Sequence, residues 1–357
     1  MTRVSTPDEA AQRRLLLALL AALERPHLAN ELPQDGAADA ELLLEVARRH
    51  RLTPLLSAIC ADRLAGSIAE ACRRDRLMTA ARNLVLGQAT EECLRAFAVA
   101  DVPVMVLKGV AYESLYGVAG ARPTADVDLL VPNDRRRAAF GVLDRLGFEP
   151  RSAAPGFDDV DYHEVAWNRR GIEVDLHMAL APRVRCRIDY ADVWAHAGST
   201  TVGHTEAHVL ASSHAAVFHT LHMAIDHFDV PALYLLDLAR LLPSAAAIEA
   251  AAETARAWGC RRPFATALAL AETFLPAWRS GHASPSPGRV AAGIASRYGS
   301  VVPLARSAQL VRKLLHFDDP FTAMRYFAVQ TGRNVREMFE RRVRQRSARE
   351  RLALDPK

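Results

Sequence analysis

Two aspartates stand two residues apart in the segment Asp126-Val127-Asp128, directly before the aliphatic run Leu129 to Val131. Side chains alternate between the two faces of a strand, so both carboxylates would point one way while the aliphatic residues point into a core. Two carboxylates on one face repel each other unless a cation lies between them, and Mg²⁺ prefers such hard oxygen ligands. A chain of this composition is expected to contain roughly one Asp-x-Asp pair by chance, so the pair needs a second signal.

A second segment of polar side chains supplies that signal. Glu173, Asp175 and His177 alternate with aliphatic residues, which predicts a strand that carries all three on one face. A third carboxylate from this strand would complete a two-metal site, in which one ion holds a triphosphate and the other activates a hydroxyl nucleophile. His177 could be a base, a substrate contact or a core histidine bonded to Asp175. His163 is expected to face His177 across the hairpin, although a one-residue slip would turn it away.

The Lys108-Gly109 pair follows a continuous apolar run and precedes a predicted short helix over 110–117. A flexible turn at a helix N-terminus binds anions readily, and the Lys108 ammonium adds a positive charge. Arg122, four residues before Asp126, is expected to add a bidentate phosphate contact. Only three of the 45 basic residues are lysines, so a lysine at this turn stands out against an arginine-rich background.

These segments occur in the order of a family pattern, LKG…RPxxDxDLLV…VDLH. The chain resembles bacterial nucleotidyltransferase-like proteins with this pattern, which belong to the DNA polymerase β-type nucleotidyltransferase superfamily. The matching strings are Val106-Leu107-Lys108-Gly109, Leu115-Tyr116, Arg122-Pro123-Thr124-Ala125-Asp126-Val127-Asp128-Leu129-Leu130-Val131, Leu143 through Phe148, and Val174-Asp175-Leu176-His177. The resemblance is dense from about residue 80 to 180 and continues more weakly to about 275, in Leu221-His222 and Leu235-Leu236-Asp237-Leu238.

The resemblance implies roles for six residues: metal binding by Asp126, Asp128 and Asp175, and nucleotide contacts by Lys108, Gly109 and Arg122. It implies that an acceptor hydroxyl attacks the α-phosphate of a nucleoside triphosphate and that pyrophosphate is released. Two Mg²⁺ ions, or Mn²⁺ in their place, would be the cofactors. The acceptor stays open and could be a small molecule, a peptide, a protein or an RNA.

One position departs from the superfamily pattern. Its usual Gly-Ser is Gly109-Val110 here, so no hydroxyl follows the glycine to touch a phosphate, and Lys108 could substitute for it. Two alternatives therefore stay open. One is a kinase-like phosphotransferase that moves the γ-phosphate to a peptide or small molecule. The other is a catalytically silent protein that binds a nucleotide or a partner.

Histidines gather after the carboxylate segments, with six of the 13 between residues 204 and 227. On a helix, His219, His222 and Asp226 would share a face, which raises a metal hydrolase as a further alternative. The spacing completes no HExxH or HD-type pattern. We therefore expect the region to line the helical side of a cleft, with His222 and Asp237 nearest the site.

The pattern as a whole predicts an α+β fold, with a small polymerase β-like nucleotidyltransferase sheet, flanking helices and mainly α-helical N- and C-terminal regions. The expected helices cover 7–24, a segment ending near Arg49, 78–99, 134–146 and several segments from about 206 onward. The expected strands cover 102–107, 127–131, 162–168 and 172–178. The expected domains are 1–100, 101–180 and 181–357.

Composition narrows the class of protein. The 357 residues are 50% hydrophobic and 24% charged, as in folded soluble proteins. The net charge of +4 gives no indication of nucleic-acid binding. Five widely spaced cysteines predict reduced thiols. The N-terminal apolar run follows acidic residues, which argues against a secretory signal, and it is too short to span a bilayer. We therefore expect a cytoplasmic protein without a membrane partner. The oligomeric state stays open, and the arginine-rich C-terminus, with its interspersed acids, favours a solvated helix over an RNA-binding tail.

Overall fold

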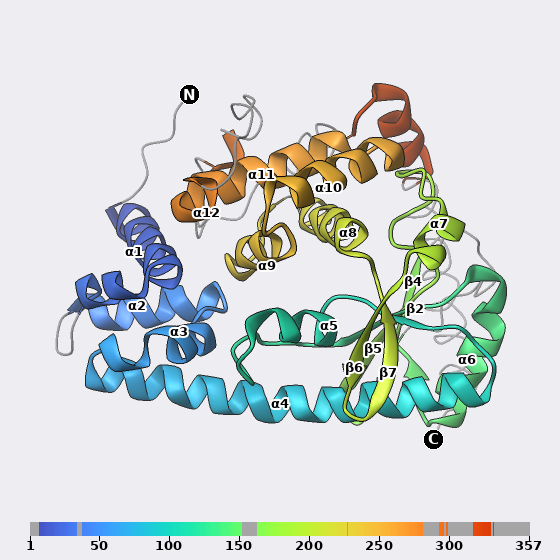
Figure 1. The fold of residues 1–357 in the computed structure, drawn as a ribbon, viewed down its shortest axis with the longest axis horizontal. Coiled ribbons are helices and arrows are strands. Elements are labelled where there is room, and N and C mark those ends of the chain that lie inside the picture. The colour runs from blue at the N-terminus through green and yellow to red at the C-terminus, as the bar shows by residue number, and fades with distance from the viewer. Residues whose placement is uncertain are drawn as a thin grey trace, which may run out of the picture.

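The computed structural model describes residues 7–33, 38–151, 163–226, 228–280, 293–295, 298, 317–329 and 331. The chain begins with four helices, α1 (Pro7–Glu24), α2 (Ala38–Arg49), α3 (Thr53–Cys60) and α4 (Gly66–Val99). Helix α1 confirms the expected helix over 7–24. Helix α4 begins at Gly66 rather than at 78, because its first turns bury Ile68 and Cys72 in the core of the N-terminal helices. It runs along one whole side of the molecule (Figure 1).

Further helices of the described residues are α5 (Val110–Glu113), α6 (Arg136–Arg145), α7 (Tyr190–Ala195), α8 (Ser212–Ile225), α9 (Leu233–Leu241), α10 (Ala245–Trp258), α11 (Arg261–Phe274) and α12 (Pro276–Ser280), and residues 293–295 and 320–329 are helical as well. Short 3₁₀ helices span Pro26–Glu31, Ala61–Arg63, Ser114–Tyr116 and Asn133–Arg135. The expected helix over 134–146 is thus a 3₁₀ turn followed by α6. Gly147, with a φ of 79°, takes the left-handed conformation usual just after a helix.

Within the described part of the chain, seven strands form one mixed sheet in the order β3-β4-β5-β2-β1-β7-β6. They are β1 (Met105–Val106), β2 (Val127–Leu130), β3 (Glu149–Pro150), β4 (Glu164–Arg169), β5 (Ile172–His177), β6 (Gly198–Val202) and β7 (Thr205–Val209). Strands β2 and β5 are parallel, whereas β1 pairs antiparallel to β2 and β4 antiparallel to β5. The turn between β4 and β5 has positive φ at Arg170 and Gly171, which is the backbone that a tight hairpin requires.

The hairpin of β6 and β7 corrects two expectations. Residues 206–209 were expected to be helical, but they lie in β7, which pairs parallel to β1, and α8 begins only at Ser212. The sheet therefore extends beyond residue 180, where the sequence placed the end of the α/β core. The β-branched residues Thr200, Thr201 and Val202 favour a strand here, and Gly203, with a φ of 60°, allows the tight turn.

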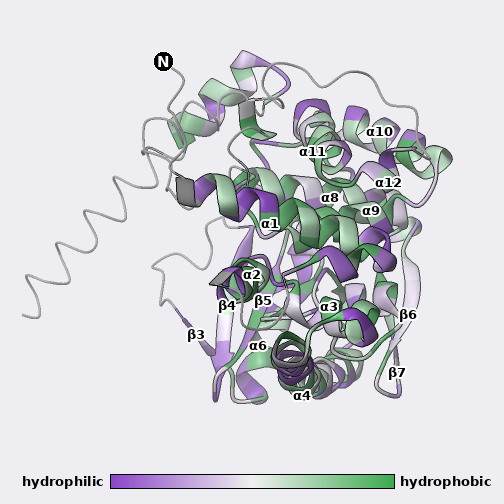
Figure 2. Cartoon of the chain, turned by 90° about the vertical axis from the view of Figure 1, so that its left-hand side faces the viewer, coloured by the Kyte–Doolittle hydropathy of each residue, from purple (hydrophilic) through white to green (hydrophobic). Residues whose placement is uncertain are grey.

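The sheet separates two hydrophobic cores. Its first face, with Val127, Leu129 and Val174, packs against residues of α4 and α6 such as Phe97 and Val142. On the second face, Leu130 joins a larger core built from α1–α3 and α8–α11. Figure 2 shows hydrophobic residues concentrated where α1, α8 and α9 come together, whereas β3 and β4 at the sheet edge are more hydrophilic. Because side chains alternate along β2 and β5, Asp128 and Asp175 lie on the second face of the sheet, the face of Leu130.

Among the described residues, no helix combines the length and the apolar character that crossing a bilayer requires. The five cysteines are all buried and unbridged, in agreement with the expectation of free thiols. The expectation for the arginine-rich C-terminus, Arg333 to Arg351, lies outside the described residues, as does His227.

Candidate active site

The parallel pairing of β2 and β5 brings the predicted carboxylates together. Asp128 and Asp175 are direct partners in the register, and Asp126 lies two residues before Asp128, on the same face. Neighbouring strands are about 4.8 Å apart, so the three carboxylates start from adjacent positions. Asp128 is 1% exposed, while Asp126 and Asp175 are half-buried.

Two side chains contact one oxygen of Asp128. The Lys108 ammonium lies 2.9 Å from Asp128 Oδ1, and Nε2 of His177 lies 3.2 Å from the same oxygen. Although burial alone would raise it, these partners keep the pKa of Asp128 well below its usual range. The same pairing outweighs burial at Lys108 and raises the pKa of its ammonium, which stays charged. The second oxygen, Asp128 Oδ2, is buried and has no hydrogen-bond partner among the described residues.

The other two carboxylates are not compensated in this way. Burial and repulsion by Asp128 raise the pKa of Asp175 to about 7. Burial and the same repulsion also raise the pKa of Asp126. Three carboxylates that share one face with too little positive charge are typical of a site that takes up a cation.

The donor chemistry fits a divalent cation, since the set consists of hard oxygens and includes the unpartnered Asp128 Oδ2. In the described part of the chain, however, no three His, Cys, Asp or Glu side chains are already arranged to hold a metal ion. Asp126, Asp128 and Asp175 thus fit the ion in type and backbone position rather than as a preformed cage.

Gly109 makes the turn that carries Lys108 to Asp128. Its backbone has a φ of 63° and a ψ of −109°, which glycine adopts without strain. A side chain there would place its Cβ 3.1 Å from Cγ2 of Thr124 and 3.3 Å from the carbonyl oxygen of Asp126. The helix that follows, α5, has only four residues, so its N-terminus adds little to the anion site expected from the sequence.

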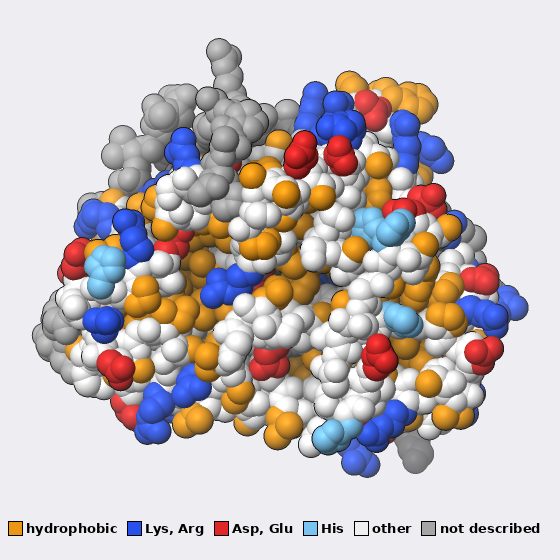
Figure 3. All heavy atoms as spheres, in the orientation of Figure 1, with side chains coloured by type: hydrophobic (Ala, Val, Ile, Leu, Met, Phe, Trp, Pro, Cys, Tyr) orange, Lys and Arg blue, Asp and Glu red, His pale blue; other side chains and the backbone are white. Residues whose placement is uncertain are grey.

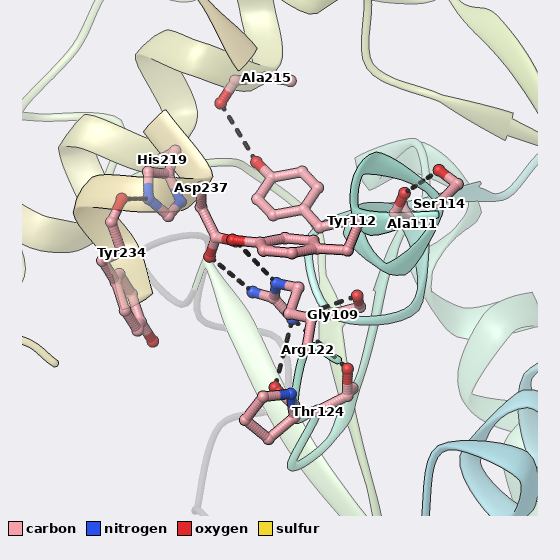
Figure 4. A network of polar contacts seen from close by, with 12 residues as sticks. Gly109, Ala111, Tyr112, Ser114, Arg122, Thr124, Ala215, His219, Tyr234 and Asp237 are labelled. Carbon is pink, nitrogen blue, oxygen red and sulfur yellow. Dashed lines mark hydrogen bonds and ion pairs between the residues drawn. The ribbon is translucent and has the colours of Figure 1, made fainter. Parts of the chain in front are cut away.

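Arg122 does not lie as expected for a phosphate contact. Its Nε and Nη2 each lie 2.9 Å from an oxygen of Asp237, and its Nη1 donates to the carbonyl oxygen of Gly109 and to Oγ1 of Thr124. Arg122 is 6% exposed, and the Tyr112 ring lies against it (Figure 4). All three guanidinium nitrogens thus have hydrogen-bond acceptors, and the bond to the Gly109 carbonyl oxygen helps to fix the turn at Gly109.

Asp237 lies in this buried network rather than beside the carboxylates. It is 0% exposed, and the Tyr116 hydroxyl donates to its Oδ1 over 2.7 Å. Burial, with a further contribution from the Lys108 ammonium, lowers the pKa of the His222 ring to about 3. Asp237, by contrast, is bonded to Arg122.

The hairpin register differs by one residue from the expectation for His163. Glu164, not His163, is the partner of His177, and Oε2 of Glu164 lies 3.4 Å from Nδ1 of His177. His163 instead uses its backbone oxygen to accept hydrogen bonds from the backbone N–H groups of Met178 and Ala179. Glu164 therefore joins the site, and only the pairing register could have revealed it.

The metal hydrolase alternative finds no support in the geometry. Nε2 of His219 bonds the backbone oxygen of Tyr234 over 2.9 Å, and His222 contacts the hydroxyl of the same tyrosine. Among the described residues these side chains form no cluster that could hold a metal ion. His219 is therefore a structural link between α8 and α9.

The chain matches several solved structures at low similarity. The crystal structure of ANT(2'')-Ia in complex with adenylyl-2''-tobramycin is 15% identical, with a TM-score of 0.34, and the match covers 54% of this chain and 97% of that one. The solution structure of antibiotic-resistance factor ANT(2'')-Ia is 14% identical, with a TM-score of 0.32, covering 54% and 91%. An antigenic nucleotidyltransferase-like protein from Paracoccidioides brasiliensis is 15% identical, with a TM-score of 0.34, covering 57% and 91%.

Among curated proteins, none matches the chain significantly in sequence. A family model does match, over residues 36–276, and its description is "Uncharacterised nucleotidyltransferase". The match includes α2–α4 and α8–α11 as well as the sheet, so it extends beyond the segment 101–180 that carries the sequence motifs. Because it covers most of the chain, the protein belongs to this nucleotidyltransferase family and is a transferase.

Proposed function

We propose that the protein transfers a nucleoside monophosphate from a nucleoside triphosphate to an acceptor hydroxyl, with divalent cations held by Asp126, Asp128 and Asp175. The observation that carries this proposal is the parallel register of β2 and β5, which aligns Asp128 with Asp175 and leaves Asp126 on the same face. The charged Lys108 beside them supplies a positive group for the substrate phosphates.

The reaction balances without a further reactant. The acceptor oxygen forms a bond to the α-phosphorus, the bond from that phosphorus to the bridging oxygen breaks, and pyrophosphate leaves with the electron pair. A bound divalent cation would neutralise phosphate charge and lower the pKa of the acceptor hydroxyl. The hydroxyl proton would pass to a carboxylate of this set, and Asp175, as the neighbour of Asp128 on β5, is the residue to which we assign this role.

The remaining residues orient this set. The His177 ring lies between two carboxylates, with Nε2 3.2 Å from Asp128 Oδ1 and Nδ1 3.4 Å from Oε2 of Glu164. Gly109 and Arg122 fix the turn before α5 and thereby the position of Lys108. Preorganised charges of this kind stabilise the charge that develops on the phosphoryl group.

The position of a radioactive label tests the proposal. The purified protein is incubated with Mg²⁺ or Mn²⁺, a cell extract as the source of acceptor, and a nucleoside triphosphate labelled at either the α- or the γ-phosphate. Transfer from the α-label alone, abolished by chelation of the cation, is the expected result. Transfer from the γ-label alone would identify a phosphotransferase. Binding of the nucleotide with no transfer from either label would identify a catalytically silent protein.

A further inference from the structure

A pocket of about 170 Å³ lies where two parallel strands end. Strands β1 and β7 pair in parallel, with Val106 opposite Val209, and the chain continues from them into α5 and α8. Residues of these strands and helices line the pocket, together with residues of β6 and Leu241 at the end of α9. Ligands commonly bind beyond the carboxyl ends of parallel strands, so the fold favours a binding site at this place.

The bottom of the pocket is apolar. Buried aliphatic residues line it, among them Leu107, Leu210, Ala215 and Leu241. The Tyr112 side chain also lines the pocket, and its hydroxyl donates to the backbone oxygen of Ala215 over 3.3 Å. On this side of the molecule, hydrophobic side chains are visible in a hollow beside α9 (Figure 3). A ligand with an apolar body would displace water from such a surface, which is favourable.

The polar groups of the pocket are hydroxyls rather than charges. Ser199, Thr200 and Ser212 line it, and a hydroxyl can both donate and accept a hydrogen bond. The described lining residues include no aspartate or glutamate, and Lys108 is the charged residue among them. Because the Lys108 ammonium lies 2.9 Å from Asp128 Oδ1, its charge is already neutralised. A charged ligand would therefore be buried without a partner, at a cost in free energy.

The pocket is in contact with the turn that carries Lys108. Lys108 and Tyr112 both line it. The Arg122 guanidinium lies 5.3 Å from the centre of the Tyr112 ring, and Arg122 bonds the carbonyl oxygen of Gly109. Figure 4 shows the Tyr112 ring between Ala215 and Arg122. A molecule in the pocket would thus pack against residues that fix the turn.

We propose that this pocket binds a small uncharged molecule with an apolar body and one hydroxyl or carbonyl group, and that this ligand holds the turn in the arrangement that places Lys108 beside Asp128. An engineered apolar cavity of about 150 Å³ binds benzene, so the ligand has roughly the size of one ring. The binding site goes beyond the proposed transfer, because its ligand need not react. The effect of the ligand on the turn rests on the proposed function.

Three probes of similar size but different charge test the site. Benzyl alcohol is uncharged, whereas benzoate is an anion and benzylamine a cation at neutral pH, and each is titrated against the full chain by saturation-transfer NMR. Benzyl alcohol should bind and raise the melting temperature, because it binds the folded state. Benzoate and benzylamine should bind at least about tenfold more weakly, since each would bury an unpaired charge. Tighter binding of either ion, or no saturable binding of benzyl alcohol, would overturn the site.

Substitutions that fill the pocket locate the binding. Ala215→Leu adds a larger side chain at the bottom, and Ser212→Phe adds one at an exposed position, where folding should be retained even if Ala215→Leu fails to fold. Each should weaken benzyl alcohol binding by at least about tenfold, because the added atoms take the space of the ligand. Ser213→Phe is the matched control, since Ser213 is the next residue of α8 and does not line the pocket. Unchanged affinity in Ser212→Phe, or an equal loss in Ser213→Phe, would contradict the assignment.

Nucleotide binding tests the effect on the turn. ATP, GTP, CTP and UTP are titrated by calorimetry with Mg²⁺, with and without saturating benzyl alcohol. The affinity for the nucleotide that binds most tightly should rise by about fivefold, because the turn is then already ordered, and this nucleotide should raise the affinity for benzyl alcohol by the same factor. Ser212→Phe should lose this coupling and Ser213→Phe should keep it. Unchanged nucleotide affinity, or no binding of any of the four, would overturn the effect on the turn.

The two proposals fail in different ways. If benzyl alcohol binds as expected but no α-label is transferred to any acceptor, the pocket assignment stands and the nucleotidyl transfer does not. If α-label is transferred and benzyl alcohol does not bind, the transfer stands and the pocket assignment falls.

Discussion

Two buried aspartates, each with a cationic partner, lie on either side of the Gly109 turn and differ in how completely they are satisfied. Asp237 receives Arg122 on both oxygens and the Tyr116 hydroxyl on one. Asp128 receives Lys108 and His177 on Oδ1, while Oδ2 has no partner among the described residues. The cluster around Asp128 also contains two carboxylates with raised pKa values. A buried charge that is completely bonded supports the fold, whereas an incompletely bonded one leaves room for a ligand.

The largest expected effect separates activity from stability at Asp175. We expect Asp175→Asn to lower transfer from an α-labelled triphosphate by about 1,000-fold, because a ligand of the proposed cation and the proton acceptor are lost together. The variant should be as stable as the wild type or more stable, since it removes a carboxylate that Asp128 repels. A large loss of melting temperature would show that Asp175 belongs with Asp237 as a structural residue. Asp144→Asn, an exposed change on α6, is the control.

The reverse is expected at Asp237. Asp237→Asn leaves the 6%-exposed Arg122 guanidinium without its counter-charge and should destabilise the protein by about 3 kcal/mol in denaturant unfolding. The double variant Arg122→Met/Asp237→Leu should recover much of that stability, because no charge is then left buried and unpaired. If the single variant is as stable as the wild type, the buried pair does not brace the turn.

A smaller effect is expected for Lys108→Arg. The ammonium makes one close contact, 2.9 Å from Asp128 Oδ1, beside a turn with little free space. A planar guanidinium is longer and cannot occupy the same position, so we expect α-label transfer to fall by about tenfold with the positive charge retained. Wild-type kinetics in this variant would show that the lysine has no special part in the site.

The smallest effect is a dependence of stability on pH in the presence of a chelator. The folded-state pKa of Asp175 is raised to about 7 from an ordinary value of 3.8, so the folded state holds a proton that the unfolded state releases. Stability from this group is therefore present at low pH and is lost as the pH rises from about 4 through 7. After allowance for partial exposure we expect a loss of about 1 kcal/mol across this range. Asp175→Asn should abolish this component, and an unchanged pH profile in the variant would contradict the assignment.

The comparison also shows what the sequence could and could not predict. The face shared by Asp126 and Asp128 follows from the two-residue alternation of a strand, which is a local property. The partner of Arg122 is 115 residues away in sequence, so no local pattern distinguishes a phosphate contact from a buried ion pair. The same holds for Glu164 and His163, where the pairing register decides which residue faces His177.

One further incorrect prediction has a physical cause. Strands β6 and β7 are short and rich in threonine and other polar residues, so they lack the aliphatic alternation that indicated β2 and β5. The carboxylates of the candidate site were thus predictable by type and spacing, whereas the partners that reach them from elsewhere in the fold were not.

Helix α4 has a consequence for how the protein can be divided. Its first turns belong to the core of the N-terminal helices through Ile68 and Cys72, and its later turns cover the sheet through Leu86 and Phe97. Removing residues before 101 would therefore uncover one face of the sheet, and ending the chain at 180 would remove the neighbour of β1 on its other side. By the same argument, a fragment able to fold on its own should begin at or before α4 and continue beyond β7 into α8–α11, which cover Leu130 on the other face of the sheet. The motif-bearing segment is not a module that evolution or an engineer could transplant alone.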